Sequence, residues 1–104
     1  MSVIRIKDFI KNSNFAGSRK KGEKIREKIV QDIQSSEDGV TLDFVQIKMI
    51  TQSFGDEILG ILTRANGIGY IKNNIRLVNE NKDIKDILNY VIQYSKKYHN
   101  EKVA

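Results

Sequence analysis

Residues 40–59, which read VTLDFVQIKMITQSFGDEIL, decide the fold. Residues 40–44 alternate apolar and polar side chains, and this pattern predicts a β-strand. The apolar phase then slips by one position, which predicts either a bulge near Gln46 or a strand buried on both faces. A short polar turn follows, and apolar residues at helical spacing predict an amphipathic helix from Ser53 to about Ala65.

Other parts of the chain supply further strands. Residues 3–9 alternate imperfectly and predict a first strand, and residues 75–78 predict a short strand near the end of the chain. Residues 67–71 fit either a loop or a short edge strand. We therefore expect three or four strands.

Two more helices are expected around these strands. Ser18 is a plausible N-cap for a helix that ends near residue 35, because its hydroxyl can accept a hydrogen bond from a backbone amide. The last helix begins around Asn81 and is expected to fray from Lys96 onward. Strands that alternate with helices predict a small α/β fold, with a largely parallel or mixed sheet and about three helices.

Composition favours one soluble cytoplasmic domain that spans residues 1–104. The chain has no cysteine and one histidine, His99, which argues against disulfides, thiolate or histidine-rich metal sites and serine–histidine triads. No apolar run approaches the roughly 20 residues of a membrane span, and no signal peptide is recognisable. We expect no metal, no cofactor and no enzymatic activity.

The net charge of +5 comes mostly from residues 19–28, which hold six cations and two glutamates. This asymmetry predicts an anionic partner at one site. A solvated basic face is the simpler interpretation, and nucleic-acid or nucleotide binding through this segment is the alternative function. The candidate anion-binding residues at the expected helix start are Ser18, Arg19, Lys20 and Lys21.

Ser53 is the best single candidate for a functional residue. Ser53 and Asp56 fit the capping-box pattern, and Asp56 with Glu57 places negative charge in the first turn of the helix. The simpler interpretation is a well-capped helix. The functional interpretation is that Ser53 is a phosphorylation site, because a phosphate there would meet both backbone amides and carboxylates. The expected partner-binding residues around it are Thr51, Gln52, Phe54, Asp56 and Glu57.

Two further groups of residues have open interpretations. Asp43 is either a buried acid directed toward the Ser53 region or a residue on the solvent face. With the two acidic residues beside Ser53 it could form a carboxylate site, but no nucleophile–base pair accompanies it. Tyr90, Tyr94 and Tyr98 recur every four residues, which favours packing at the edge of the core over a stacking platform for nucleic acid.

The chain resembles the STAS-like domain family, a bacterial group of uncertain function. Residues 40–44 and 53–60 carry this resemblance, residues 17–19 and 75–79 extend it, and it covers about residues 15–95. The family is similar in turn to the STAS domains of anti-sigma factor antagonists. The resemblance implies a small STAS-like fold and a regulatory role through protein–protein contact.

Anti-sigma factor antagonists switch partners when a histidine-kinase-like ATPase phosphorylates a serine at the start of the helix after the central strand. Their motif is aspartate, serine, serine, glycine. It falls on Thr51, Gln52, Ser53 and Phe54, so the resemblance implies that Ser53 is the phosphorylated position. Because Thr51 and Phe54 depart from the motif, partner binding without phosphorylation is the alternative.

Overall fold

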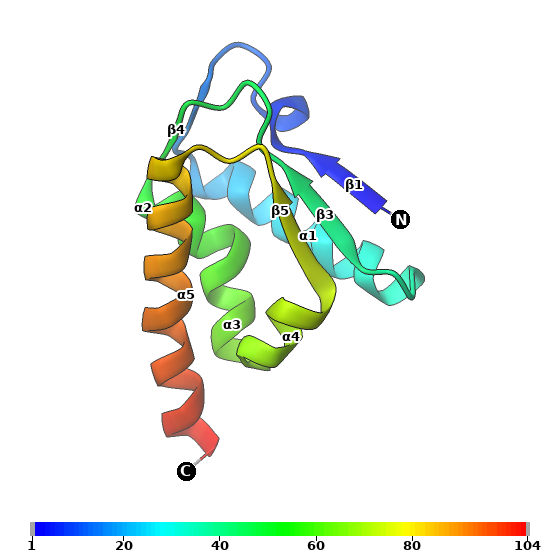
Figure 1. Cartoon of the computed structure of the whole chain (residues 1–104), viewed down its shortest axis with the longest axis vertical. Helices are drawn as coiled ribbons and strands as arrows, with labels where there is room; N and C mark the ends of the chain where they lie inside the picture. The colour runs from blue at the N-terminus through cyan, green and yellow to red at the C-terminus, as the bar shows by residue number, and fades with distance from the viewer. Residues whose placement is uncertain (1, 104) are drawn as a thin grey trace.

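The computed structural model describes residues 2–103, and their side chains as far as residue 99 (Figure 1). Strands and helices alternate along most of the chain. The strands are β1 (Ser2–Arg5), β2 (Phe15–Ala16), β3 (Val40–Asp43), β4 (Met49–Ile50) and β5 (Ile75–Val78). The α-helices are α1 (Arg19–Ser35), α2 (Gln52–Gly55), α3 (Ile61–Asn66), α4 (Ile68–Asn74) and α5 (Lys82–Val103). A 3-10 helix η1 covers Ile6–Phe9, and a π-helical segment η2 covers Asp56–Gly60.

A three-stranded parallel sheet lies at the centre of the fold, in the order β1-β3-β5. Ile4, Leu42 and Leu77 stand in register on the face that the helices cover. On the opposite face, Val3 and the side chain of Arg76 are exposed. Strands β2 and β4 form a separate parallel pair, in which Phe15 stands opposite Met49. The expected small α/β fold with a largely parallel sheet is therefore confirmed.

Helices α2 and α3, with η2 between them, form one continuous helical segment from residue 52 to residue 66. This segment lies between α1 and α5 (Figure 1). Phe54, Ile58 and Leu59 on it are completely buried, as are Ile25 on α1 and Leu88 on α5. The core is therefore filled by the apolar faces that the helical periodicity predicts.

Two of the expected strand features are wrong. The first strand ends at Arg5 and continues as η1, which turns the chain so that Ile6 and Ile10 both point into the core. The phase slip after residue 44 is neither a bulge nor a continued strand. It is a tight turn, in which the Ile47 amide donates to the Phe44 carbonyl at 3.0 Å and Gln46 has a φ of 66°.

The two expectations for residues 67–71 and for the end of α5 are also wrong. Residues 68–74 form α4, which starts directly after Gly67, and Gly67 has the expected positive φ at the end of α3. Helix α5 does not fray at Lys96 but continues to Val103. Ser95 is completely buried, and the His99 ring nitrogen Nδ1 hydrogen-bonds the Arg64 carbonyl at 3.0 Å. These tertiary contacts keep the end of α5 helical, although its residues are mostly polar.

Gly39 and Gly69 allow a comparison between a glycine that the backbone requires and one that it does not. Gly39 has a φ of +77°, and a Cβ there would lie 2.4 Å from the Asn74 carbonyl oxygen. We expect Gly39→Ala to lower the free energy of unfolding by at least about 2 kcal/mol, because both strain and overlap oppose the side chain. Gly69→Ala, in a helix with open space around it, should be neutral or stabilise by up to about 0.5 kcal/mol. Urea unfolding followed by circular dichroism measures both changes, and equal effects would contradict this account.

Candidate functional site

The helix after β4 begins two residues earlier than the capping-box pattern indicates. Thr51, not Ser53, is the N-cap: its Oγ1 accepts a hydrogen bond from the Phe54 amide at 3.0 Å. The same hydroxyl donates to the Gly17 carbonyl at 3.3 Å, and the Thr51 amide donates to the Ala16 carbonyl at 3.0 Å. Thr51 thus joins the helix start to the segment that precedes α1. The capping box of Ser53 and Asp56 is wrong, because a hydroxyl two residues earlier already meets the first amides.

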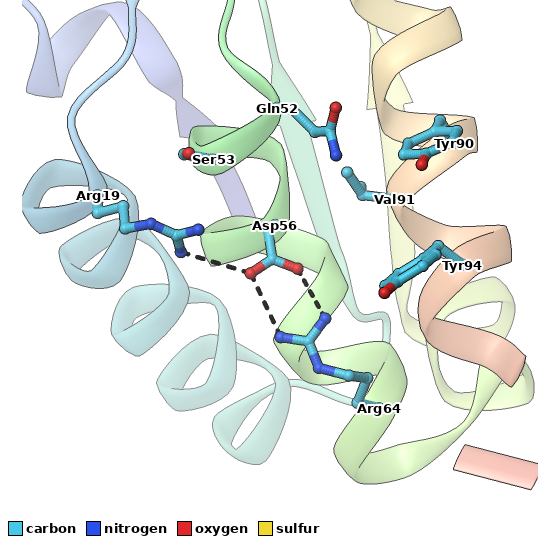
Figure 2. A pocket seen from close by; sticks show the side chains of 8 residues that line it. All are labelled: Arg19, Gln52, Ser53, Asp56, Arg64, Tyr90, Val91 and Tyr94. Atoms are coloured by element: carbon cyan, nitrogen blue, oxygen red, sulfur yellow. Dashed lines mark hydrogen bonds and ion pairs between the residues drawn. The ribbon is translucent and has the colours of Figure 1, made fainter. Parts of the chain in front are cut away.

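Ser53 lies instead in the first turn of the helix, at an open cleft between that turn and α5. Figure 2 shows Ser53 and Gln52 above the carboxylate of Asp56, with Tyr90 and Tyr94 on the opposite wall. The cleft has a volume of about 480 Å³. Within the described part of the chain, the Ser53 hydroxyl makes no hydrogen bond. The cleft is lined by Arg19, Gln52, Ser53, Asp56, Arg64, Tyr90, Val91 and Tyr94.

Asp56 sits at the floor of the cleft and is ion-paired. Arg64 binds it with both terminal nitrogens, at 2.7 Å to Oδ1 and 3.3 Å to Oδ2, and Arg19 adds a contact of 3.4 Å to Oδ2 (Figure 2). The hydrogen bonds from Arg64, reinforced by Arg19, hold the pKa of Asp56 below its ordinary value of 3.8 against the opposing effect of burial. Asp56 is therefore a fixed carboxylate and not a proton donor at neutral pH.

Glu57 is paired from the other side, by α1. Arg26 Nη1 lies 3.3 Å from the Glu57 carboxylate and 3.0 Å from its carbonyl oxygen, and Arg19 Nη1 lies 3.5 Å from the carboxylate. A Cβ on Gly22 would lie 2.7 Å from the Glu57 Cβ, so this glycine lets α1 approach closely. We refer to Arg19, Arg26, Asp56, Glu57 and Arg64 as the arginine–carboxylate cluster.

The π-helical segment η2 shapes this cluster. Its wider turn begins at Asp56 and ends at Gly60, and such bulges often occur at functional sites. A Cβ on Gly60 would lie 2.4 Å from Asp56 Oδ1 and 3.2 Å from the Ser95 hydroxyl, so glycine leaves room for the ion pair. Arg64 Nη1 also donates to that hydroxyl at 2.9 Å. The cluster therefore connects α1, the central helical segment and α5.

Two of the expected partner-binding residues are buried. Phe54 is completely buried in the core, and Glu57 is only 7% exposed. Both face inward because the helix must bury one side against α1 and α5. Thr51 is partly buried, and Gln52 and Asp56 line the cleft, so these three residues remain beside Ser53 as expected.

The tyrosines of α5 do not pack at the edge of the core. Their side chains are 40–54% exposed and contact one another along the outside of the helix. Tyr90 and Tyr94 are stacked with ring centres 6.2 Å apart, and the Tyr94 and Tyr98 hydroxyls are hydrogen-bonded at 2.9 Å. The four-residue spacing shows that the three tyrosines share one face of the helix, but it does not show whether that face is buried. The prediction that they pack at the edge of the core is therefore wrong.

Three of the six cations in the basic segment of α1 pair with carboxylates of the described chain. Arg19 and Arg26 belong to the arginine–carboxylate cluster, and Lys28 pairs with Asp32 at 3.0 Å. Of the expected anion-binding residues, Ser18 caps α1 by accepting from the Lys21 amide at 3.3 Å, as predicted. The Lys21 ammonium donates to the Phe9 carbonyl at 3.1 Å, and Lys20 is exposed.

Asp43 does not join the acidic pair at the cleft. Its Oδ1 accepts hydrogen bonds from the Val45 amide and the Asn79 side chain, both at 2.9 Å, and so stabilises the turn after β3. Among the described residues, no three histidine, cysteine or acidic side chains are grouped to hold a metal ion. No helix within residues 2–103 is long and apolar enough to cross a membrane. The structure gives the carboxylate-site interpretation no geometric support.

Several residues at the site were not predicted, namely Arg26, Arg64 and Ser95. Asp56 and Arg64 are eight positions apart, about two helical turns, and this spacing was the available signal for their pairing. Arg26 and Ser95 reach the site from helices that are distant in sequence. No local pattern reports such contacts.

The Asp56–Arg64 pair gives a test of this geometry. Asp56→Asn should lower the free energy of unfolding at pH 7 by about 1–3 kcal/mol, between the values typical of exposed and buried pairs. Because the folded-state pKa lies below 3.8, this contribution is complete above that value and is lost as the pH falls through the lowered pKa. The difference in the free energy of unfolding between wild type and Asp56→Asn, measured by urea unfolding, should therefore become smaller at acid pH.

The control is Asp86→Asn, which removes a pair with Lys82 whose side chains are 60% and 87% exposed. We expect it to cost less than about 0.5 kcal/mol. A structural role for the cluster would be contradicted if Asp56→Asn lowered the free energy of unfolding no more than Asp86→Asn does, or if its effect stayed constant at acid pH.

Comparison with known proteins places this chain in a family. The chain matches no curated protein and no solved structure. The sequence model of a STAS-like domain of unknown function (DUF4325) matches residues 21–85, which include most of α1, the β3 strand, the central helical segment and β5. The match spans more than half of the chain and contains Ser53 and the whole cluster except Arg19. The chain therefore belongs to the STAS-like domain family of unknown function.

Proposed function

We propose that this chain is a regulatory module that acts by binding another protein. Its contact surface centres on Thr51, Gln52, Ser53 and Asp56 and includes the segment before α1. The proposed partner is a histidine-kinase-like ATPase, by analogy with the anti-sigma factor antagonists that this family resembles. In this proposal the ATPase phosphorylates Ser53 and the complex dissociates.

The placement of Ser53 is the observation that carries this proposal. Thr51 supplies the N-cap, so the Ser53 hydroxyl is not needed to stabilise the helix start. The residue lines an open cleft and is only partly buried, so another protein can approach it. A serine that is structurally dispensable, accessible and in the first helical turn is suited to be modified without loss of the fold.

The charges around Ser53 suggest how modification would be sensed. A phosphate on Ser53 would carry about −1.5 to −2 charges near the carboxylate of Asp56, which lies three residues further along the helix. Arg19 lines the same cleft, is 57% exposed, and holds Asp56 only at 3.4 Å. Arg19 could therefore turn from Asp56 to the phosphate, which would alter the charge pattern of the contact surface.

Nucleic-acid binding by the basic segment of α1 has less support. Arg19, Arg26 and Lys28 already pair with carboxylates of the same chain, so the net charge that this segment presents is smaller than its sequence suggests. Such an interaction would depend on Lys20 and Lys24 and would weaken steeply with salt. It would not depend on Ser53.

The test uses the full chain with a candidate histidine-kinase-like ATPase chosen from the genome that encodes the chain. We expect the ATPase to retain the chain in a pull-down, and ATP to add the mass of one phosphoryl group to wild type but not to Ser53→Ala. Ser53→Glu should weaken binding by about tenfold, because it places a carboxylate beside Asp56. Intact mass spectrometry and the pull-down give the two readouts.

Ser36→Ala is the matched control, because Ser36 lies at the far end of α1 and, among the described residues, its hydroxyl accepts only from the Asp38 amide. It should bind and gain phosphate as wild type does. Binding without added mass would support recognition of unmodified Ser53. Absence of binding by wild type and by Ser53→Ala would refute the proposed partner.

A further inference from the structure

A second concave site lies beside the start of α1, separate from the cleft. It is an apolar pocket of about 360 Å³, lined by Ile10, Phe15, Gly17, Ser18, Lys21 and Thr51. The Phe15 ring lies over Gly17: a Cβ on that glycine would be 2.7 Å from the ring. The ring is nonetheless 49% exposed, and Met49, opposite it in the β2–β4 pair, is 38% exposed. The pocket thus opens on an apolar surface that the described residues leave uncovered.

The surroundings of the pocket are strongly cationic. Two segments, residues 7–21 and residues 44–52, meet here through the β2–β4 pair, and we call them the loop end (Figure 1). The loop end contains one acidic residue, Asp8, and six cationic residues: Lys7, Lys11, Arg19, Lys20, Lys21 and Lys48. Only Arg19 among these cations pairs with a carboxylate of the described chain. Lys20 and Lys48, from the two different segments, are exposed.

We propose that the loop end binds an acidic protein segment that places one apolar side chain in this pocket. The excess of positive charge selects carboxylates on the partner, and the pocket is of a size to hold an aliphatic or aromatic anchor. The inference rests on the proposed function, because the segment belongs to the protein partner and Thr51 lines both the pocket and the proposed contact surface. It adds the chemistry by which that partner is recognised.

The pocket itself favours a protein segment over other polyanions. A discrete apolar cavity fits one side chain, and a buried anchor inside a charged rim is the usual anatomy of a protein interface. A nucleic acid would instead use exposed aromatic faces for stacking, and the Phe15 ring is partly covered, with Cε2 and Cζ close to Gly17. An anionic membrane would need no cavity.

The probe is a fluorescein-labelled short peptide with a central leucine and acidic residues on both sides. Fluorescence anisotropy with the full chain should show saturable binding that weakens as sodium chloride rises from about 0.05 M to about 0.5 M. The same peptide with a central alanine should bind at least about fivefold more weakly, because the pocket is then left unfilled. Phe15→Ala, which removes one wall, should weaken the leucine peptide to a similar degree.

A matched pair of variants separates local from general electrostatics. Lys20→Glu with Lys48→Glu should weaken peptide binding by at least about tenfold, because both charges lie at the loop end. Lys72→Glu with Lys85→Glu makes the same change in net charge on exposed parts of α4 and α5. This control should change the affinity for the peptide by less than about twofold. Circular dichroism melting checks that each variant is folded.

Equal binding of the leucine and alanine peptides, or equal loss in both charge variants, would overturn the inference. So would tighter binding of single-stranded DNA or of phosphatidylserine vesicles through Phe15 and Lys20. A chain that binds the ATPase but not the peptide would refute this inference alone. A chain that binds the peptide but not the ATPase would refute the proposed partner and leave the pocket assignment standing.

Discussion

The arginine–carboxylate cluster is the constraint on which the helical layer depends. Asp56 and Glu57 lie side by side in η2, and three arginines from α1 and α3 balance their charge. Removing two adjacent carboxylates from water is costly, and only close ion pairs and hydrogen bonds offset that cost. Gly22 and Gly60 allow the required approach, so the cluster fixes where α1 and α5 lie relative to the central helical segment.

Most of the polar side chains at this site are already used in contacts that stabilise the fold. Because the carboxylates are occupied by arginines, they shape the cleft but have little capacity left for chemistry. Thr51 has a comparable structural role, since one hydroxyl caps the helix and also contacts the segment before α1. In the same turn, the Ser53 hydroxyl makes no hydrogen bond within the described part of the chain. The proposed partner contact rests on this unused hydroxyl.

The cleft and the apolar pocket lie on either side of the first turn of the helix and differ in character. The cleft is polar, with two arginines, a carboxylate and stacked tyrosines, whereas the pocket is apolar with a cationic rim. Thr51 stands between them through its contacts with Gly17 and Phe54. A partner that covered both would sense a modification in the cleft while its anchor stayed in the pocket.

The sequence by itself determined the α/β class, the parallel sheet, the central strand, the three main helices and the presence of a helix start near Ser53. These features follow from apolar periodicity and cap residues, which are local properties. The tertiary structure alone decided that Thr51 is the cap, that Phe54 and Glu57 face inward, and that the tyrosines are exposed. It also decided that Arg19 and Arg26 of the basic segment are ion-paired, because their carboxylate partners Asp56 and Glu57 lie more than 30 positions away along the chain. Periodicity shows that a helix has a buried face, but only packing shows what covers it.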